Sequence, residues 1–116
     1  MRQHTPGPWR IGKGAIDYGA VVSDISPNPR RLDAEKADEV AAYGGYVVAE
    51  SITRNNKPLI AMAPGILAAC EDAHQLLSTC RELQGEAAKR QVLQAAMNRL
   101  EDVLDALDEL EREVTA

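Results

Sequence analysis

Short runs of β-branched and aromatic residues in the first half of the chain predict a small sheet. The runs span residues 9–11, 20–25 and 46–52, and Gly and Pro residues separate them. Runs of this length with turn residues between them are typical of antiparallel strands joined by short loops. We therefore expect an antiparallel sheet of three or four strands within residues 1–55.

The segment between the second and third runs leaves two possibilities open. Pro27 and Pro29 predict an extended loop over residues 26–31. Residues 33–43 can form a short helix or stay mobile. Long irregular loops in small domains are often either functional or disordered, and the composition does not choose between these two outcomes.

The second half of the chain has a helical pattern, because after Gly65 the sequence contains no Pro and a single Gly, Gly85. The first helix is expected over about residues 56–83. Pro64 either kinks this helix or marks a second start after a short first piece. Gly85 is placed to end it.

A second helix is expected over about residues 86–114, where apolar residues follow a heptad repeat. Apolar residues recur at intervals of seven at Leu93, Leu100, Leu107 and Val114. A second set, Ala96, Val103 and Leu110, lies three positions after the first three of these, and Met97 and Leu104 widen the apolar stripe. A helix of about 28 residues extends roughly 42 Å, longer than so small a globule conveniently covers. The surplus stripe predicts packing against the first helix and a second chain together, and thus a homo-oligomer.

With 116 residues the chain fits one α+β domain, residues 1–116, which buries roughly 65% of its unfolded surface. It lacks an apolar run long enough for a membrane helix, and its polar start does not match a secretory signal. We expect a soluble, cytoplasmic protein. Cys70 and Cys80 would lie about 15 Å apart on one helix, too far for a disulfide, and are expected to be reduced and mostly buried.

Charge is divided unevenly between the halves. Residues 1–57 carry eight Lys and Arg against seven Asp and Glu, whereas residues 58–116 carry five against eleven. From Glu101 onward the chain carries seven acidic residues and one basic residue, Arg112. This surface would repel a phosphate backbone, so duplex nucleic acid is not an expected partner.

The start of the first helix supports two interpretations. Asn55 or Asn56 is placed to cap it, with Pro58 tolerated in its first turn. The same free backbone amides could instead attract a phosphate, with Arg54 and Lys57 supplying charge beside it. Pro58 removes one amide donor, which weakens the second interpretation.

A stacking platform for a base would have to come from four aromatic residues, all in the first half: Trp9, Tyr18, Tyr43 and Tyr46. The alternative is that Trp9 only fills the space between the sheet and the first helix. Four arginines could supply forks for phosphate, although each is individually more typical of a solvated surface: Arg10, Arg30, Arg31 and Arg54.

Catalytic chemistry finds little support. Cys70 and His74 have the i, i+4 spacing of a helical metal pair, but a third ligand or an orienting group is missing. The Gly12-Lys13-Gly14 stretch is too short for a phosphate-binding loop and predicts a turn. We expect no enzyme activity, cofactor or metal.

Two separated motifs carry a family resemblance. His4-Thr5-Pro6-Gly7-Pro8-Trp9 opens the chain, and Asn56 precedes Leu59-Ile60-Ala61-Met62-Ala63-Pro64, with Ile66-Leu67 following; Val48-Ala49-Glu50-Ser51 lies between them. The sequence thereby resembles small phage and prophage proteins that read T-P-G-P-W early and N-A-x-L-I-A-A-A-P-x-L-L at the helix start. The resemblance covers the first 70 residues, and the chain departs from it at Lys57-Pro58 and Gly65-Ile66.

The layout is also similar to that of the Thoeris anti-defence sponges, which sequester cyclic ADP-ribose isomers or cyclic oligonucleotides as dimers or hexamers without cleaving them. This resemblance implies a cyclic nucleotide ligand bound between protomers in the infected bacterial cell. It points first to Trp9, Arg10, Arg54, Asn55 and Asn56, and then to Tyr43, Tyr46 and Lys57. The alternatives are a phage accessory protein acting by protein–protein interaction through its helical hairpin, and a small-molecule hydrolase.

Overall fold

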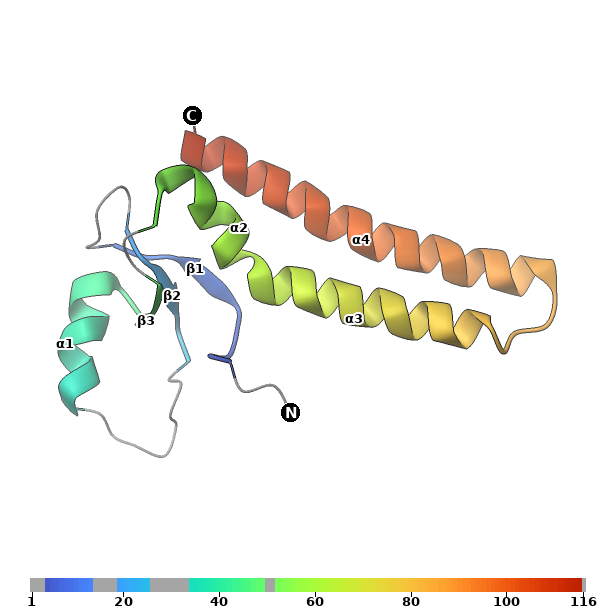
Figure 1. Ribbon diagram of the computed structural model, residues 1–116, viewed down its shortest axis with the longest axis horizontal. Helices are drawn as coiled ribbons and strands as arrows, with labels where there is room; N and C mark the ends of the chain where they lie inside the picture. Colours follow the sequence, from blue (N-terminus) through green and yellow to red (C-terminus); the bar gives the residue numbers. More distant parts are fainter. Residues whose placement is uncertain (1–3, 14–18, 26–33, 50–51, 116) are drawn as a thin grey trace.

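Three short strands pair antiparallel in the computed structural model of the chain, which describes residues 4–13, 19–25, 34–49 and 52–115. They are β1 (Trp9–Ile11), β2 (Val21–Ser23) and β3 (Tyr46–Ala49), in the order β1-β2-β3. The predicted fold class, a small antiparallel sheet followed by long helices, is confirmed (Figure 1). The second strand is shorter than the run over residues 20–25 that predicted it.

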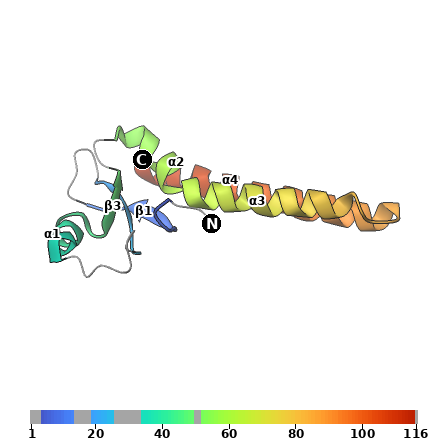
Figure 2. The same cartoon turned by 60° about the horizontal axis from the view of Figure 1, so that its bottom comes forward.

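The central strand β2 is buried on both faces rather than on one. Val21, Val22 and Ser23 have no exposed surface. The pairing with β3 is irregular here, because Val21 pairs with Ala49 and Val22 with Val47, which leaves one extra residue on β3. Helix α2 contacts β1 and β2, whereas α1 packs beside β3 on the far side of the sheet from the hairpin (Figures 1 and 2).

Residues 34–43 form a helix, α1 (Ala34–Tyr43), which resolves the alternative left open by the sequence. The helix ends at Gly44, which has a φ of +80° and donates its N–H to the carbonyl oxygen of Val40 at 2.8 Å. This is the left-handed C-terminal cap that glycine adopts without strain. The extended loop predicted over residues 26–31 lies outside the described residues.

The helical half begins with a 3₁₀ turn, η1 (Arg54–Asn56), followed by α2 (Lys57–Ala61), α3 (Ala63–Cys80) and α4 (Glu86–Thr115). Pro64 therefore marks a second start after a short first piece, because it occupies the first turn of α3, where the missing N–H costs no helical bond. The α3 helix ends three residues earlier than predicted.

Gly85 does not end α3, contrary to the sequence prediction. It has a φ of +90° and directly precedes α4, where its carbonyl oxygen accepts the N–H of Lys89 at 3.3 Å. Arg81 occupies the C-cap of α3 instead. Gly85 thus supplies the left-handed turn that reverses the chain between the two helices.

The two long helices pack antiparallel through small side chains. Ala69 and Ala73 of α3 and Ala96 and Val103 of α4 are buried between them. Small residues let the helix axes approach closely. The resulting hairpin extends from the sheet as an arm, and the molecule measures 57 × 39 × 14 Å (Figure 2).

We expect Ala69→Leu to destabilise the protein by about 1–3 kcal/mol, because the added volume forces the two helices apart. Ala68→Leu is the matched control, since Ala68 is exposed on the same helix and its substitution should stay within about 0.5 kcal/mol. Urea unfolding followed by circular dichroism measures both. Equal stabilities of the two variants would contradict a close alanine contact.

Candidate functional site

The two motifs that the sequence analysis singled out lie against each other. Gly7 packs so closely on α3 that a Cβ added to it would lie 2.6 Å from the Cβ of Pro64. The Trp9 indole Nε1 donates to the carbonyl oxygen of Thr5 at 3.1 Å, which folds the opening segment back on itself. The opening segment and the helix start therefore form one structural unit.

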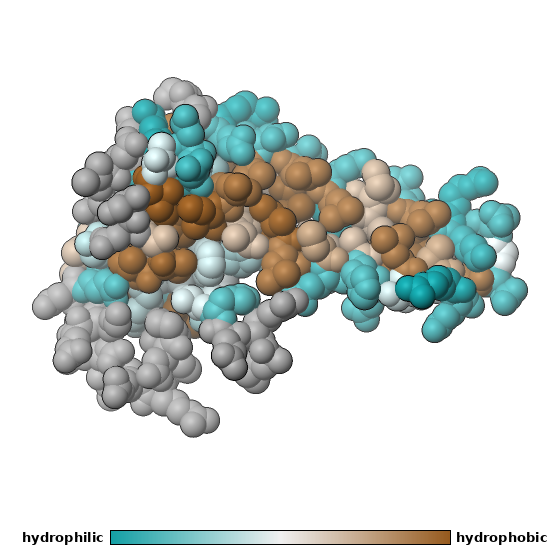
Figure 3. Space-filling model, viewed as in Figure 1, coloured by the Kyte–Doolittle hydropathy of each residue, from teal (hydrophilic) through white to brown (hydrophobic). Residues whose placement is uncertain are grey.

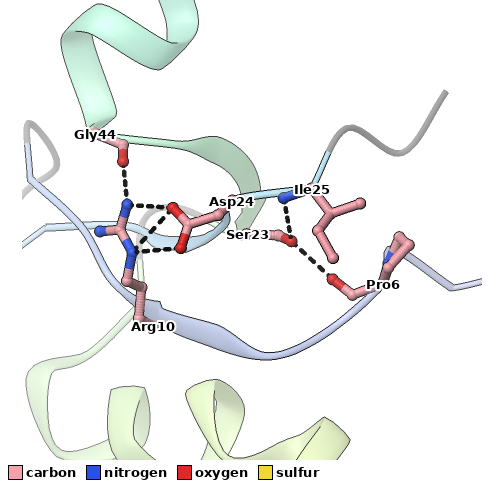
Figure 4. A network of polar contacts seen from close by, with 6 residues as sticks. All are labelled: Pro6, Arg10, Ser23, Asp24, Ile25 and Gly44. Atoms are coloured by element: carbon pink, nitrogen blue, oxygen red, sulfur yellow. Dashed lines mark hydrogen bonds and ion pairs between the residues drawn. The ribbon is translucent and has the colours of Figure 1, made fainter. Parts of the chain in front are cut away.

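A buried serine anchors this unit to the sheet. The Ser23 hydroxyl donates to the carbonyl oxygen of Pro6 at 2.7 Å and accepts the N–H of Ile25 at 3.1 Å (Figure 4). Ser23 itself has no exposed surface, and both bonds are part-buried. Sequence reasoning missed this residue, since a lone serine at the end of a strand carries no distinctive signal.

Trp9 borders a small apolar hollow at the start of α3. The hollow encloses about 300 Å³ and is lined by His4, Trp9, Ala63, Pro64 and Leu67. The His4 ring meets the half-buried indole edge to face, with ring centroids 6.2 Å apart. The tryptophan thus lies between sheet and helix, as the simpler of its two interpretations expects, and base stacking on it stays a prediction.

Arg10 is engaged by a carboxylate. Its Nη2 donates to Asp24 Oδ1 at 2.7 Å and to the carbonyl oxygen of Gly44, and its Nε donates to Asp24 as well (Figure 4). These hydrogen bonds raise the pKa of the Arg10 guanidinium and lower the pKa of the Asp24 carboxyl. An incoming phosphate would have to displace the carboxylate.

Tyr46 lies at the Trp9 end of the sheet, whereas the carbonyl oxygen of Tyr43 accepts the N–H of Lys13 at 2.9 Å, beyond the other end of β1. Tyr43 is the last residue of α1, and Tyr46 pairs with Ser23, which in turn pairs with Trp9 on its other side. Both tyrosines are half-buried. The structure thus sets Tyr46 and Trp9 level with each other on either side of β2, whereas the Arg10 guanidinium lies beside Asp24 and Gly44. Tyr18 lies outside the described residues.

The remaining four predicted residues lie together at η1 and the start of α2. Arg54 donates from Nε to the carbonyl oxygen of Val114 at 2.8 Å, which ties the end of α4 to the junction. Asn55 and Asn56 are exposed, whereas Lys57 has no exposed surface and is itself engaged within the molecule. Lys57 is therefore not presented to an external ligand as the sequence suggested.

Asn56 occupies the N-cap position of α2 with Pro58 in the first turn, as one of the two sequence alternatives predicts, but the expected side-chain capping bond does not form. Asn56 precedes α2, but its side chain makes no capping hydrogen bond and its backbone is already helical, with φ −92° and ψ −13°. A capping residue normally has an extended backbone that turns its side chain toward the amides of the first turn. The 3₁₀ turn removes that geometry, and the N–H of Asn56 donates to the carbonyl oxygen of Thr53 instead.

The open space beside Asn55 is acidic. A hollow of about 370 Å³ is lined by Asn55, Asp108, Glu111 and Arg112, and Arg112 also pairs with Glu109 at 3.2 Å. Two carboxylates among four lining residues disfavour a phosphate at this position.

Cys70 and His74 are both exposed on α3, with Cys70 on nearly the same side as Leu77, seven residues further on. Cys70 is exposed and Cys80 half-buried, so the expectation of mostly buried thiols is wrong for Cys70. Within the part of the chain that the structure describes, no group of three or more His, Cys, Asp or Glu side chains could hold a metal ion.

The hairpin carries a surface of exposed apolar side chains. We define the apolar face as the side of α3 and α4 that carries Leu77, Leu93, Met97, Leu100, Leu104 and Leu107. Four of these are strongly exposed: Leu77 by 45%, Leu93 by 46%, Met97 by 52% and Leu104 by 55%. Figure 3 looks onto this face, where apolar residues run along the hairpin between polar edges.

The opposite face of the hairpin is polar. Arg99 donates from Nε to Asp72 at 2.9 Å across the two helices, and a shallow groove beside this pair is lined by Gln75 and Thr79 as well. The apolar residues of the heptad pattern are therefore divided between two surfaces of α4. Ala96 and Val103 pack on α3, whereas Leu93, expected in the same stripe, is left on the open face.

Among the helices that the structure describes, none is both long and apolar enough to cross a membrane. A protein-family model described as Salmonella phage P22 protein Y8K6 matches residues 1–107. The chain belongs to this phage protein family. Searches of curated proteins and of solved structures gave no match.

We expect Asn56→Ala to change the free energy of unfolding by less than about 0.5 kcal/mol, because its side chain caps no helix. A capping role would cost about 1 kcal/mol. Arg54→Met is the contrasting variant, since it removes the part-buried bond to Val114 and should cost about 1 kcal/mol or more. Denaturant midpoints compare the two. A larger loss for Asn56→Ala than for Arg54→Met would contradict this assignment.

Proposed function

We propose that this member of the phage family is an accessory protein that acts through protein–protein contacts of its helical hairpin, in the cytoplasm of the infected cell and without catalysing a reaction. The apolar face is the observation that supports this function. Scattered single leucines on a surface need no explanation, but here they follow one another along one side of the hairpin.

The surroundings of the face also favour a protein partner. Apolar side chains occupy its middle, while charged residues such as Arg90 and Asp108 lie toward its edges, as in protein interfaces with an apolar core and a polar rim. Leucine and methionine side chains on a straight helix present ridges and grooves that another helix can fill.

The residues at the sheet and the junction are largely occupied by structural contacts. Arg10 pairs with Asp24, Arg54 holds the end of α4, and Lys57 is buried. These contacts explain why such residues occur together without requiring a ligand. The exposed apolar side chains of the hairpin, in contrast, have no such structural contact to account for them.

Sequestration of a cyclic nucleotide is the second candidate, and it is supported by the resemblance in layout and by the position of Trp9 and Tyr46 level with each other on either side of β2. Calorimetry with cyclic ADP-ribose isomers and cyclic oligonucleotides separates the two candidates. We expect no binding tighter than about 10 μM. Tighter binding, with the ligand recovered intact after heat denaturation, would replace the leading proposal.

The leading proposal is tested by affinity capture of the tagged protein from phage-infected bacteria that also express a second copy under another tag. We expect wild type to retain a protein, either the second copy or a phage or host protein. Leu104→Glu should lose it by roughly tenfold or more, because a carboxylate then lies in the centre of the face.

Ala106→Glu is the matched control for this capture. Ala106 is exposed on the same helix, and at 3.6 residues per turn it points about 200° away from Leu104. It should therefore retain what wild type retains. Recovery of nothing by wild type, or the same loss in both variants, would refute a contact through the apolar face.

A further inference from the structure

We infer that the occupant of the apolar face is a second copy of this chain, with the two hairpins stacked face to face and pointing in opposite directions. This inference rests on the proposed function, for which it names the partner. The arrangement is a four-helix bundle made from two hairpins, in which each helix is antiparallel to its neighbours.

The exposed area of the chain supports a dimer. The chain has 8098 Å² of accessible surface, whereas a monomeric protein of 12.6 kDa exposes about 6,200 Å². The excess of roughly 1,900 Å² exceeds the area of about 800 Å² that each partner buries in a stable interface. The radius of gyration, 17.8 Å, likewise exceeds the value of about 13 Å for a compact domain of this length.

The apolar row on α4 is nearly symmetric about its own centre. It runs from Leu93 to Leu107, and Leu100 lies midway. A two-fold axis at Leu100 that reverses the helix direction sets Leu93 of one protomer opposite Leu107 of the other and brings Met97 near Leu104. Each exposed residue then meets an apolar residue, as a self-complementary interface requires.

The same axis gives a consistent pairing on α3. The Arg99–Asp72 bond shows that the middle of α4 lies level with residues 71 and 72 of α3. The axis therefore brings Leu77 near Ile66 of the other protomer. Ile66 lies eleven residues before Leu77, which at 3.6 residues per turn puts it on the same side of α3, so both helices of the hairpin fit the same symmetry.

Charge selects the reversed orientation. The first turns of α4 carry Arg90 at the edge of the face, and its last turns carry Asp108 and Glu111. Reversal sets Arg90 level with residue 110 of the partner, between these two carboxylates. Hairpins pointing in the same direction would stack α4 on α3, where Arg90 lies level with Arg81 as well as Glu82 and so meets one acidic residue beside a basic one. Charge complementarity of this kind fixes register more than it adds affinity.

Light scattering coupled to chromatography tests the dimer with the full chain. We expect wild type and Ala106→Glu to show twice the monomer mass of 12.6 kDa at micromolar concentration, and Leu104→Glu to show the monomer mass. Circular dichroism confirms that each variant is folded. A wild-type monomer up to sub-millimolar concentration would overturn the inference.

Disulfide trapping tests the orientation. In a Cys70→Ser, Cys80→Ser background, Leu100→Cys should give a covalent dimer on oxidation with copper phenanthroline, because the axis brings the two copies of residue 100 within the roughly 7 Å that a disulfide spans. Ala106→Cys on the opposite face should not. A dimer in solution without crosslinking through residue 100 would overturn the reversed arrangement.

The two proposals fail in different ways. If wild type is a monomer but captures a phage or host protein that Leu104→Glu loses, the second copy is the wrong occupant and the proposed function stands. If wild type is a monomer and captures nothing, both are refuted. If Leu104→Glu dimerises as strongly as wild type, the dimer forms through another surface and the inference is overturned.

Discussion

A hairpin of two helices can bury only one stripe of each helix, and most features of this protein follow from that limit. The stripe that α3 and α4 share consists of small residues, Ala69, Ala73 and Ala96, so the helices approach closely. Close approach leaves less width for larger side chains beside the contact. The apolar positions of α4 span more of its circumference than one neighbour covers, and the leucine row stays outside.

The position of the sheet keeps this face open. The opening segment fixes the sheet at one end of the hairpin, because Gly7 contacts Pro64 at the very start of α3 and Trp9 fills the space beside it. Any side chain at position 7 would push the segment away from the helix. The two sequence motifs therefore act together, because their contact holds the sheet beside the first turn of α3 and away from the rest of the hairpin.

The secondary structure could be predicted well where a local signal was strong. The bounds of β1 and α4 agree with their patterns almost to the residue, and Pro64 does mark a new helix start. The role of a residue was predicted wrongly where it lies at the boundary between two elements and could belong to either. Asn56 has capping chemistry, but the preceding 3₁₀ turn sets its backbone, and Gly85 serves the turn into α4 rather than the end of α3.

Residues whose role depends on tertiary contacts could be predicted least. The burial of Ser23 depends on Pro6, seventeen residues away, and the pairing of Arg10 with Asp24 depends on strand register. For the same reason, the heptad pattern indicated that α4 has more apolar surface than it needs but not which leucines would remain exposed. That division depends on how closely the alanines allow α3 to approach.

Affinity and orientation are separate properties of such a hairpin. The exposed leucines supply a driving force that is roughly proportional to the apolar area removed from water and has no preferred direction. Direction comes from the uneven charge of α4, whose basic first turns and acidic last turns make the hairpin electrically polar along its length. The same acidic end that disfavours a phosphate beside Asn55 would attract the basic end of a reversed copy. One charge distribution thus argues against an anionic ligand at the junction and for a partner with the composition of the chain itself.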